Sequence, residues 1–172
     1  MGIHPESGIL AREDLLSDPL TGFGTRSKLL HDLEQAVQPE SDPTLLVIFC
    51  LEGFEEYTDL LGRLESQSLL LRLAGRLATS LAPSAVCYRP RADEFAALVH
   101  TPIANVKPVL DNAILALREK GGIVAVSAAF GAAMLPDEAS DAIGALTIAD
   151  QRLSSNAPRR RPRNRRRFVR PE

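Results

Sequence analysis

The clearest feature of the hydrophobic pattern is a continuous apolar run at 44–51, TLLVIFCL. A run of this length predicts a strand that is buried on both faces, as in the centre of an α/β sheet. Shorter runs at 85–89 and 95–100 predict two more strands, joined by a hairpin at 90–94, and a β-type run at 123–134 predicts a fourth. The chain therefore has the strands of one small sheet.

Helical spacing fills the intervals between these strands. The clearest helix is predicted at 66–81, where Leu and Ala side chains form one apolar stripe. Gly62 is expected to end a short helix before it, and Thr25 or Ser27 to cap the first helix of the chain. The other helical periods lie at 29–37, 54–61, 106–118 and 139–153. The order of elements predicts an α/β sandwich around a mixed sheet with a central β-hairpin.

Length and composition restrict the class of protein. The 172 residues fit one domain, and an apolar fraction of 45% is enough for its core. No apolar stretch approaches the ~20 residues needed to cross a bilayer, and the N-terminus lacks the basic and apolar regions of a secretory signal. The only cysteines, Cys50 and Cys87, lie in apolar contexts and are predicted to be buried free thiols. We therefore expect a cytoplasmic protein.

Charge divides the chain into two parts. Residues 158–172 hold eight Arg and one Glu, a net charge of +7, whereas the preceding body carries −9, which together give the −2 of the whole chain. An Arg block with interspersed Pro predicts a disordered tail. Such a tail could stay solvated, contact nucleic acid, acidic lipid or an acidic protein surface, or fold back on the acidic body.

Four short segments carry the candidate chemistry. They are DPLTGFGTR at 18–26, CLEGFEEYTDLLG at 50–62, YRPRADEF at 88–95, and VSAAFG at 126–131 together with IAD at 148–150. In order and spacing they resemble D-x-L-T-G-L-x-N-R, D-x-D-x-F-K-x-x-N-D-x-x-G, the GGDEF signature, and a strand with S-x-G followed by a helix with A-D. The chain is therefore similar to the GGDEF, or diguanylate cyclase-like, family, with Arg91-Ala92-Asp93-Glu94-Phe95 in place of the signature.

The resemblance implies a domain organisation and a fold. It assigns 18–157 to the domain, which leaves a leader at 1–17 and the Arg-rich tail at 158–172. The implied fold is α/β, of the nucleotidyl-cyclase-like or palm type, in which helices flank a mixed β-sheet and a central hairpin carries the signature. A leader of this length is too short for a sensor domain, so regulation by a fused sensor is not expected within this chain.

The resemblance also implies a reaction and its metal ions. Family members condense two GTP molecules into cyclic di-GMP across a dimer of domains, and they hold two Mg²⁺ ions with acidic side chains. Cys50 stands at the family's first metal-binding Asp, and its soft thiol is a poor Mg²⁺ ligand. The acidic pair of the signature is retained as Asp93 and Glu94, the candidate catalytic and metal-binding residues. Glu52 could supply one more metal-binding oxygen.

The positions that the resemblance assigns to the nucleotide are changed as well. The family reads guanine with an Asn and an Asp, and Thr58 and Gln67 stand there. The two signature glycines, which let the backbone approach the triphosphate and where φ > 0 is a candidate requirement, are Arg91 and Ala92. These four side chains are candidate nucleotide-binding residues, with Arg91 able to meet phosphate through its guanidinium.

Phosphate-binding and regulatory positions follow the same trend. The family's phosphate-binding Lys corresponds to Ala157, whereas its nearby Arg corresponds to Arg161, a further candidate nucleotide contact at the head of the tail. The family's inhibitory R-x-x-D motif is absent, because Ala82 and Ala85 occupy its two positions.

We therefore predict a degenerate GGDEF domain with little or no cyclase activity, acting as a nucleotide-binding, dimerising or interaction module in cyclic-di-GMP-type signalling. Expected partners are GTP or another guanine nucleotide, a second copy, or a signalling protein, with Mg²⁺ or Mn²⁺ needed only if nucleotide binds. The alternative is a weakly active diguanylate cyclase with non-standard metal ligands. His31 and His100 are predicted to be a surface and a strand-end histidine rather than ligands.

Overall fold

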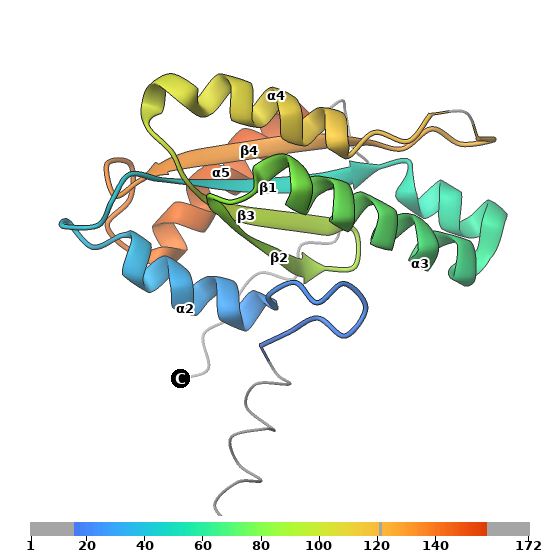
Figure 1. Ribbon diagram of the computed structural model, residues 1–172, viewed down its shortest axis with the longest axis horizontal. Helices are drawn as coiled ribbons and strands as arrows, with labels where there is room; N and C mark the ends of the chain where they lie inside the picture. The colour runs from blue at the N-terminus through green and yellow to red at the C-terminus, as the bar shows by residue number, and fades with distance from the viewer. Residues whose placement is uncertain (1–15, 121, 158–172) are drawn as a thin grey trace, which may run out of the picture.

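The computed structural model describes residues 16–120 and 122–157 (Figure 1). The Arg-rich tail and nearly all of the predicted leader lie outside these residues. The described elements are α2 Arg26–Ala36, β1 Thr44–Glu52, α3 Phe54–Leu81, β2 Ala85–Arg91, β3 Glu94–His100, η1 Ile103–Asn105, α4 Val106–Ala116, β4 Ser127–Leu135 and α5 Ala142–Asn156. The predicted order of helices and strands is confirmed, with a short 3₁₀ helix added between β3 and α4.

Two local predictions about helices can be checked directly. The Thr25 hydroxyl accepts a hydrogen bond from the Lys28 amide at 3.4 Å, so Thr25 is the N-cap of α2. At Gly62 the backbone leaves the helical region, with φ 85° and ψ 173°, which confirms the predicted break. The helix resumes directly after the glycine instead of at Ser66, because a single left-handed residue is enough to redirect the chain.

The four strands form one sheet in the order β2-β3-β1-β4. All three strand pairs are antiparallel, whereas we expected a mixed sheet. The crossover through α3 makes β2 run in the same direction as β1, but β3 lies between them, so neither strand has a parallel neighbour in the sheet. Among the described residues, parallel pairing is confined to a single bridge between Gly24 and Tyr88.

The central strand β1 is buried on both faces, as its apolar run predicted (Figure 1). Val47, Phe49 and Leu51 pack into a cluster with apolar side chains of α3 and α4. Ile48 and Cys50 point to the opposite face, into a cluster with side chains of α2 and α5. Alternation along one strand thus supplies both halves of the core, because successive side chains point to opposite faces.

Helix α5 lies very close to β4. A Cβ added at Gly131 would stand 1.9 Å from the Ala149 carbonyl oxygen and 2.3 Å from the Leu153 nitrogen. Only glycine therefore permits this approach, and the fourth sequence segment is explained by packing: Gly131 in the strand and Ala149 in the helix meet each other.

Neither a disulfide nor a membrane span is present in the described part of the chain. Cys50 is buried and Cys87 is partly exposed, and both are free thiols, so the prediction of two buried thiols is wrong for Cys87. Within residues 16–120 and 122–157 no helix combines the length and apolar character needed to cross a bilayer.

Candidate functional site

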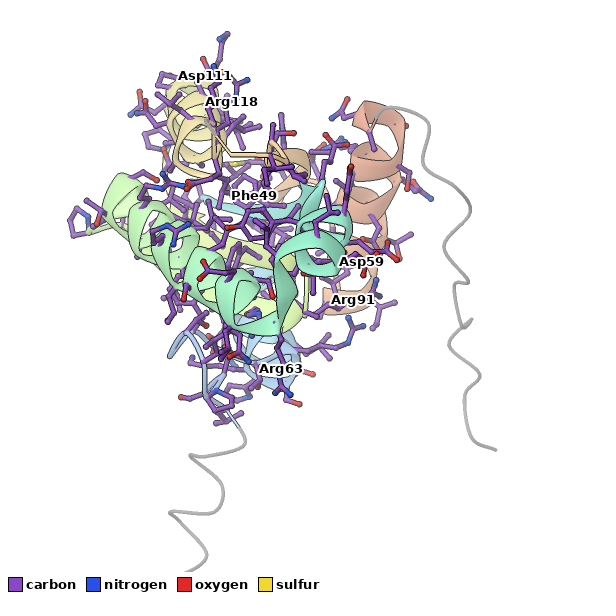
Figure 2. All side chains as sticks on the ribbon, turned by 90° about the vertical axis from the view of Figure 1, so that its right-hand side faces the viewer. Phe49, Asp59, Arg63, Arg91, Asp111 and Arg118 are labelled. Carbon is purple, nitrogen blue, oxygen red and sulfur yellow. The ribbon has the colours of Figure 1, made fainter. Side chains whose placement is uncertain are left out.

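The candidate residues meet at one edge of the sheet, where β1 ends and the β2–β3 hairpin turns. The Leu51 amide donates to the Asp93 carbonyl at 2.9 Å, which holds the hairpin tip against the end of β1. Gly53 then reverses the chain into α3 with φ 80°, and a Cβ at this position would stand 2.5 Å from the Ala125 carbonyl oxygen. Figure 2 faces this edge and labels Asp59 and Arg91 on it.

Three carboxylates lie at this edge. Glu94 pairs with Cys50 across the strands and is buried, with 6% exposure. The Cys50 thiol points at Asp93, with Sγ 4.0 Å from Oδ2. Glu52 lies two residues along β1 and accepts a hydrogen bond from the Ser127 hydroxyl at 3.4 Å. Sequence analysis therefore placed Glu52, Asp93 and Glu94 correctly in one region.

A cation from the chain itself already faces the buried carboxylate. The Arg91 guanidinium lies 3.8 Å from the Glu94 carboxylate, and the Arg91 side chain remains 49% exposed. Its remaining donors can face solvent or a ligand. Arg91 thus gives this edge a tethered monovalent cation that is half accessible.

The three carboxylates do not form a metal centre in the described residues. No group of three or more His, Cys, Asp or Glu side chains there has the arrangement to hold a metal ion. Cys50 contributes a soft ligand where a hard oxygen would suit Mg²⁺, and Arg91 adds a positive charge beside Glu94. The residues present do not fit Mg²⁺, so no catalytic step is derived through this ion.

The hairpin turn is built without left-handed residues. Positive φ values in the described chain occur only at Gly22, Gly53 and Gly62, so Arg91 and Ala92 have ordinary backbone conformations. The sequence-based concern that these two positions need φ > 0 is therefore wrong for this chain. Their effect lies in the side chains, which occupy the space around the hairpin tip.

Arg89 anchors this hairpin, and sequence analysis missed it. Its guanidinium donates to the Ala92 carbonyl at 2.9 Å and to the Asp18 carboxylate at 3.2 Å, with both charged side chains largely buried. Asp18 also accepts from the Thr21 amide and hydroxyl at 2.9 and 2.7 Å. Burial alone would raise the pKa of Asp18, but the Thr21 hydrogen bonds and the Arg89 charge outweigh it and lower this pKa.

A second polar pair ties the first helix to β2. The buried Tyr88 hydroxyl donates to Asp32 at 2.6 Å, and Lys28 contacts the same carboxylate at 2.6 Å. Burial, and the hydrogen bond to Asp32, raise the pKa of Tyr88 far above its ordinary value. Burial also raises the pKa of the neighbouring Cys87 thiol to about 11, so this thiol is protonated and unreactive at neutral pH. These residues are structural.

Comparison with known proteins agrees with the sequence segments. The family model for the diguanylate cyclase GGDEF domain matches residues 15–164. The chain belongs to the GGDEF family. No curated protein gives a significant match.

Solved GGDEF structures share the fold. The diguanylate cyclase SiaD from Pseudomonas aeruginosa, solved with its activator SiaC, has 22% identity and a TM-score of 0.72, over 87% of this chain and 61% of SiaD. A sensory box/GGDEF protein from Caulobacter crescentus CB15 has 24% identity and a TM-score of 0.70, over 82% and 97% of the two chains. The GGDEF domain of DgcB from Caulobacter crescentus, solved with c-di-GMP, has 17% identity and a TM-score of 0.70, over 90% of each chain.

Of the nucleotide positions of the GGDEF family, two lie on α3, one on each side of the Gly62 break. The Thr58 hydroxyl donates to the Phe54 carbonyl of its own helix at 2.9 Å, and Gln67 is half-buried in the second half of α3. Arg91 and Ala92 are exposed at the hairpin tip. Arg161 lies outside the described residues.

The family's inhibitory positions form an apolar surface in this chain. Ala82 and Ala85 line an open hollow of about 450 Å³ together with Phe23, Val86 and Cys87. The two predicted non-ligand histidines are consistent with their assignment: His31 is exposed on α2, and His100 ends β3, where its Nδ1 lies 3.0 Å from the Thr44 hydroxyl.

Proposed function

We propose that this GGDEF domain is a non-catalytic binding and interaction module of cytoplasmic cyclic-di-GMP-type signalling. The observation that carries the proposal is the altered edge: Cys50 points at Asp93, and Arg91 pairs with Glu94. A family reaction that depends on hard oxygen ligands for Mg²⁺ lacks a suitable ligand set in this arrangement. The scaffold around the edge is complete, which favours retained binding over loss of all function.

Two relatives support the two kinds of partner. DgcB was solved with c-di-GMP and SiaD with a protein activator. We propose that this chain likewise binds a guanine nucleotide, a second copy or a signalling protein, with Mg²⁺ or Mn²⁺ needed only for the nucleotide. Candidate nucleotide contacts are Arg91 and Ala92 at the hairpin tip, with Thr58, Gln67 and Arg161.

Product analysis tests the absence of catalysis. Purified full-length protein is incubated with GTP and either Mg²⁺ or Mn²⁺, and cyclic di-GMP is quantified by liquid chromatography. We expect the wild type to form no more product than Asp93→Ala. Product formation that Asp93→Ala abolishes would contradict the proposal and establish the second candidate, a weakly active cyclase. That candidate is favoured by one observation, the presence of Glu52, Asp93 and Glu94 at the same edge.

Calorimetry separates nucleotide binding from pure protein interaction. GTP is titrated into the wild type and into Arg91→Ala, with inorganic triphosphate and guanosine as separate ligands. A Kd tighter than ~100 μM, corresponding to about 5.5 kcal/mol, supports a nucleotide-binding module. Weaker binding of all three ligands would leave dimerisation or docking of a protein partner as the function of the domain.

A further inference from the structure

Helix α5 delivers the end of the described chain to the edge that carries the carboxylates. The Asn156 side-chain amide donates to the Phe130 carbonyl at 3.1 Å, close to the start of β4. Ala157, which follows, packs against the cluster that contains Cys50 and Ala129. The residues after Ala157 therefore begin on the α5 face of the sheet, at the end where β1 stops.

The acidic side chains of this end form a surface that we call the carboxylate edge: Glu52, Glu55, Glu56, Asp93 and Glu94. Glu52 and Glu94 follow the side of the sheet to which Cys50 points, because Glu94 pairs with Cys50 and Glu52 lies two residues beyond it. Glu55 and Glu56 are exposed in the first turn of α3. Their position also favours the helix dipole, which explains two of the five charges without any ligand.

A guanidinium is already bound at the carboxylate edge. Arg91 contacts Glu94 at 3.8 Å, so this edge accommodates an arginine side chain beside its most buried carboxylate. One guanidinium balances only one of the five negative charges. The edge therefore retains an excess of negative charge and favours further cationic groups over anions.

The next residues of the chain supply such groups. Residues 158–172 contain eight Arg and carry a net charge of +7, and three of these arginines, at 159–161, follow Ala157 almost directly. A chain extends by at most about 3.3–3.6 Å per residue, so 15 residues reach roughly 50 Å. The whole carboxylate edge is within reach of a segment that starts beside it.

We propose that residues 158–172 dock through their arginine side chains onto the carboxylate edge of their own domain. Each exposed ion pair is weak and sensitive to salt, but the tether keeps the effective concentration of guanidinium groups high at this surface. Docking there covers the hairpin tip and limits the access of ligands to it. The proposal goes beyond the proposed function, since it holds whether or not the domain binds nucleotide.

Paramagnetic relaxation in the full-length chain tests the docking. A nitroxide is attached at Glu172→Cys in a Cys87→Ala background, because Cys50 is buried. We expect strong broadening of the amides of 52–56 and 93–94, little broadening of residues 42–44 and 100–102 at the opposite end of β1, and loss of the effect at 0.5 M salt. A mixture of ¹⁵N-labelled unmodified chain and unlabelled nitroxide chain is expected to show no broadening, since the contact is within one chain.

Charge-matched variants make the test specific. The edge variant Glu52→Gln/Glu55→Gln/Glu56→Gln is expected to reduce the relaxation enhancement about threefold or more. The control Glu34→Gln/Glu40→Gln/Asp111→Asn removes three exposed charges elsewhere and is expected to leave it unchanged. Thermal unfolding confirms that both variants fold.

Three outcomes would overturn the proposal. These are broadening that persists in the edge variant, broadening that appears in the mixed sample and so indicates a second copy, and absence of broadening in the wild type while short duplex DNA or RNA binds the wild type and the edge variant equally. The last outcome would assign the tail to nucleic acid. None of these outcomes depends on GTP binding, so failure here is distinct from failure of the proposed function.

Discussion

Two neighbouring regions of this domain differ sharply in how their charges are satisfied. In the turn at 18–24, Asp18 is held by Thr21 and by Arg89, whose side chain also reaches the Ala92 carbonyl. At the hairpin tip a few residues further on, Glu94 has only a long contact of 3.8 Å to Arg91 among its printed ion pairs, and Asp93 faces a thiol. The first region is an anchor built from short, directed hydrogen bonds. The second is a set of carboxylates whose natural counter-charge is only partly supplied.

The difference separates what the fold requires from what a ligand requires. An anchor must be satisfied within the chain, because a buried charge without a partner is costly. A binding edge can leave carboxylates for a cation that arrives from elsewhere. Substitutions that leave the anchor intact can therefore accumulate at the edge without loss of the fold.

The largest effect is expected from the packing that both regions depend on. Gly131→Val would place side-chain atoms against the backbone of α5, where a Cβ alone would lie 1.9 Å from the Ala149 oxygen. We expect a loss of about 3 kcal/mol or more in the free energy of unfolding by urea. Gly75→Ala is the control, because a Cβ there meets nothing within 4 Å and should stabilise helix α3 by about 0.5–1 kcal/mol. Equal stability of Gly131→Val and wild type would show that α5 does not approach β4 so closely.

The anchor itself is the next largest. Asp18→Asn removes the charge that pairs with Arg89 and weakens the hydrogen bonds from Thr21, and we expect a loss of about 2 kcal/mol at neutral pH. Because the pKa of Asp18 is lowered in the folded protein, its charged form stabilises the fold above the unfolded-state pKa of about 4. This contribution is lost as the pH falls through the lower folded-state pKa.

The pH dependence therefore distinguishes the anchor from a simple loss of packing. Unfolding of wild type and Asp18→Asn is measured at several pH values, with the exposed Asp137→Asn as the control. The difference between wild type and Asp18→Asn should be constant above pH of about 5 and should shrink below about 4. A difference that does not change with pH would mean that the charge of Asp18 does not stabilise the turn.

Sequence patterns predicted the core better than the anchor for a physical reason. The run at 44–51 and the Gly62 break are local signals, since burial on both faces and a left-handed residue each leave a mark within a few positions. The Asp18–Arg89 pair joins residues 71 positions apart, and nothing in either segment alone marks a partner. The antiparallel order was missed because apolar runs define strands but not their neighbours.

The candidate edge was predicted in part. The spacing of the segments correctly brought Glu52, Asp93 and Glu94 together, because they follow or precede strands that pair. The pairing of Arg91 with Glu94 was not predicted, since the choice among solvent, phosphate and a neighbouring carboxylate depends on side-chain direction. Residue identities indicated which ligands are missing, and the structure adds the cation that replaces them.

The edge can be sharpened by restoring a metal ligand. Cys50→Asp adds a hard carboxylate beside Asp93, and Arg91→Gly removes the cation beside Glu94. We expect the double variant to bind Mn²⁺ at least about tenfold more tightly than wild type, or about 1.4 kcal/mol, in a calorimetric titration. Arg63→Gly in place of Arg91→Gly is the control for loss of an exposed arginine. Unchanged Mn²⁺ affinity in the double variant would show that other features of the edge exclude the metal.

The smallest effect is expected at Thr58, whose position the family uses to read guanine. Its hydroxyl donates to the Phe54 carbonyl within α3, a bond that Thr79 repeats with Gly75 at the same 2.9 Å further along the helix. A hydroxyl engaged with its own helix adds little to stability, so Thr58→Ala and the matched Thr79→Ala should each change the free energy of unfolding by less than about 0.5 kcal/mol. We also expect less than about a twofold change in GTP affinity for both, because 0.4 kcal/mol corresponds to this factor. A tenfold loss confined to Thr58→Ala would mean that its hydroxyl leaves Phe54 to bind the nucleotide, and the edge would then retain more of the family's reading of guanine than its carboxylates suggest.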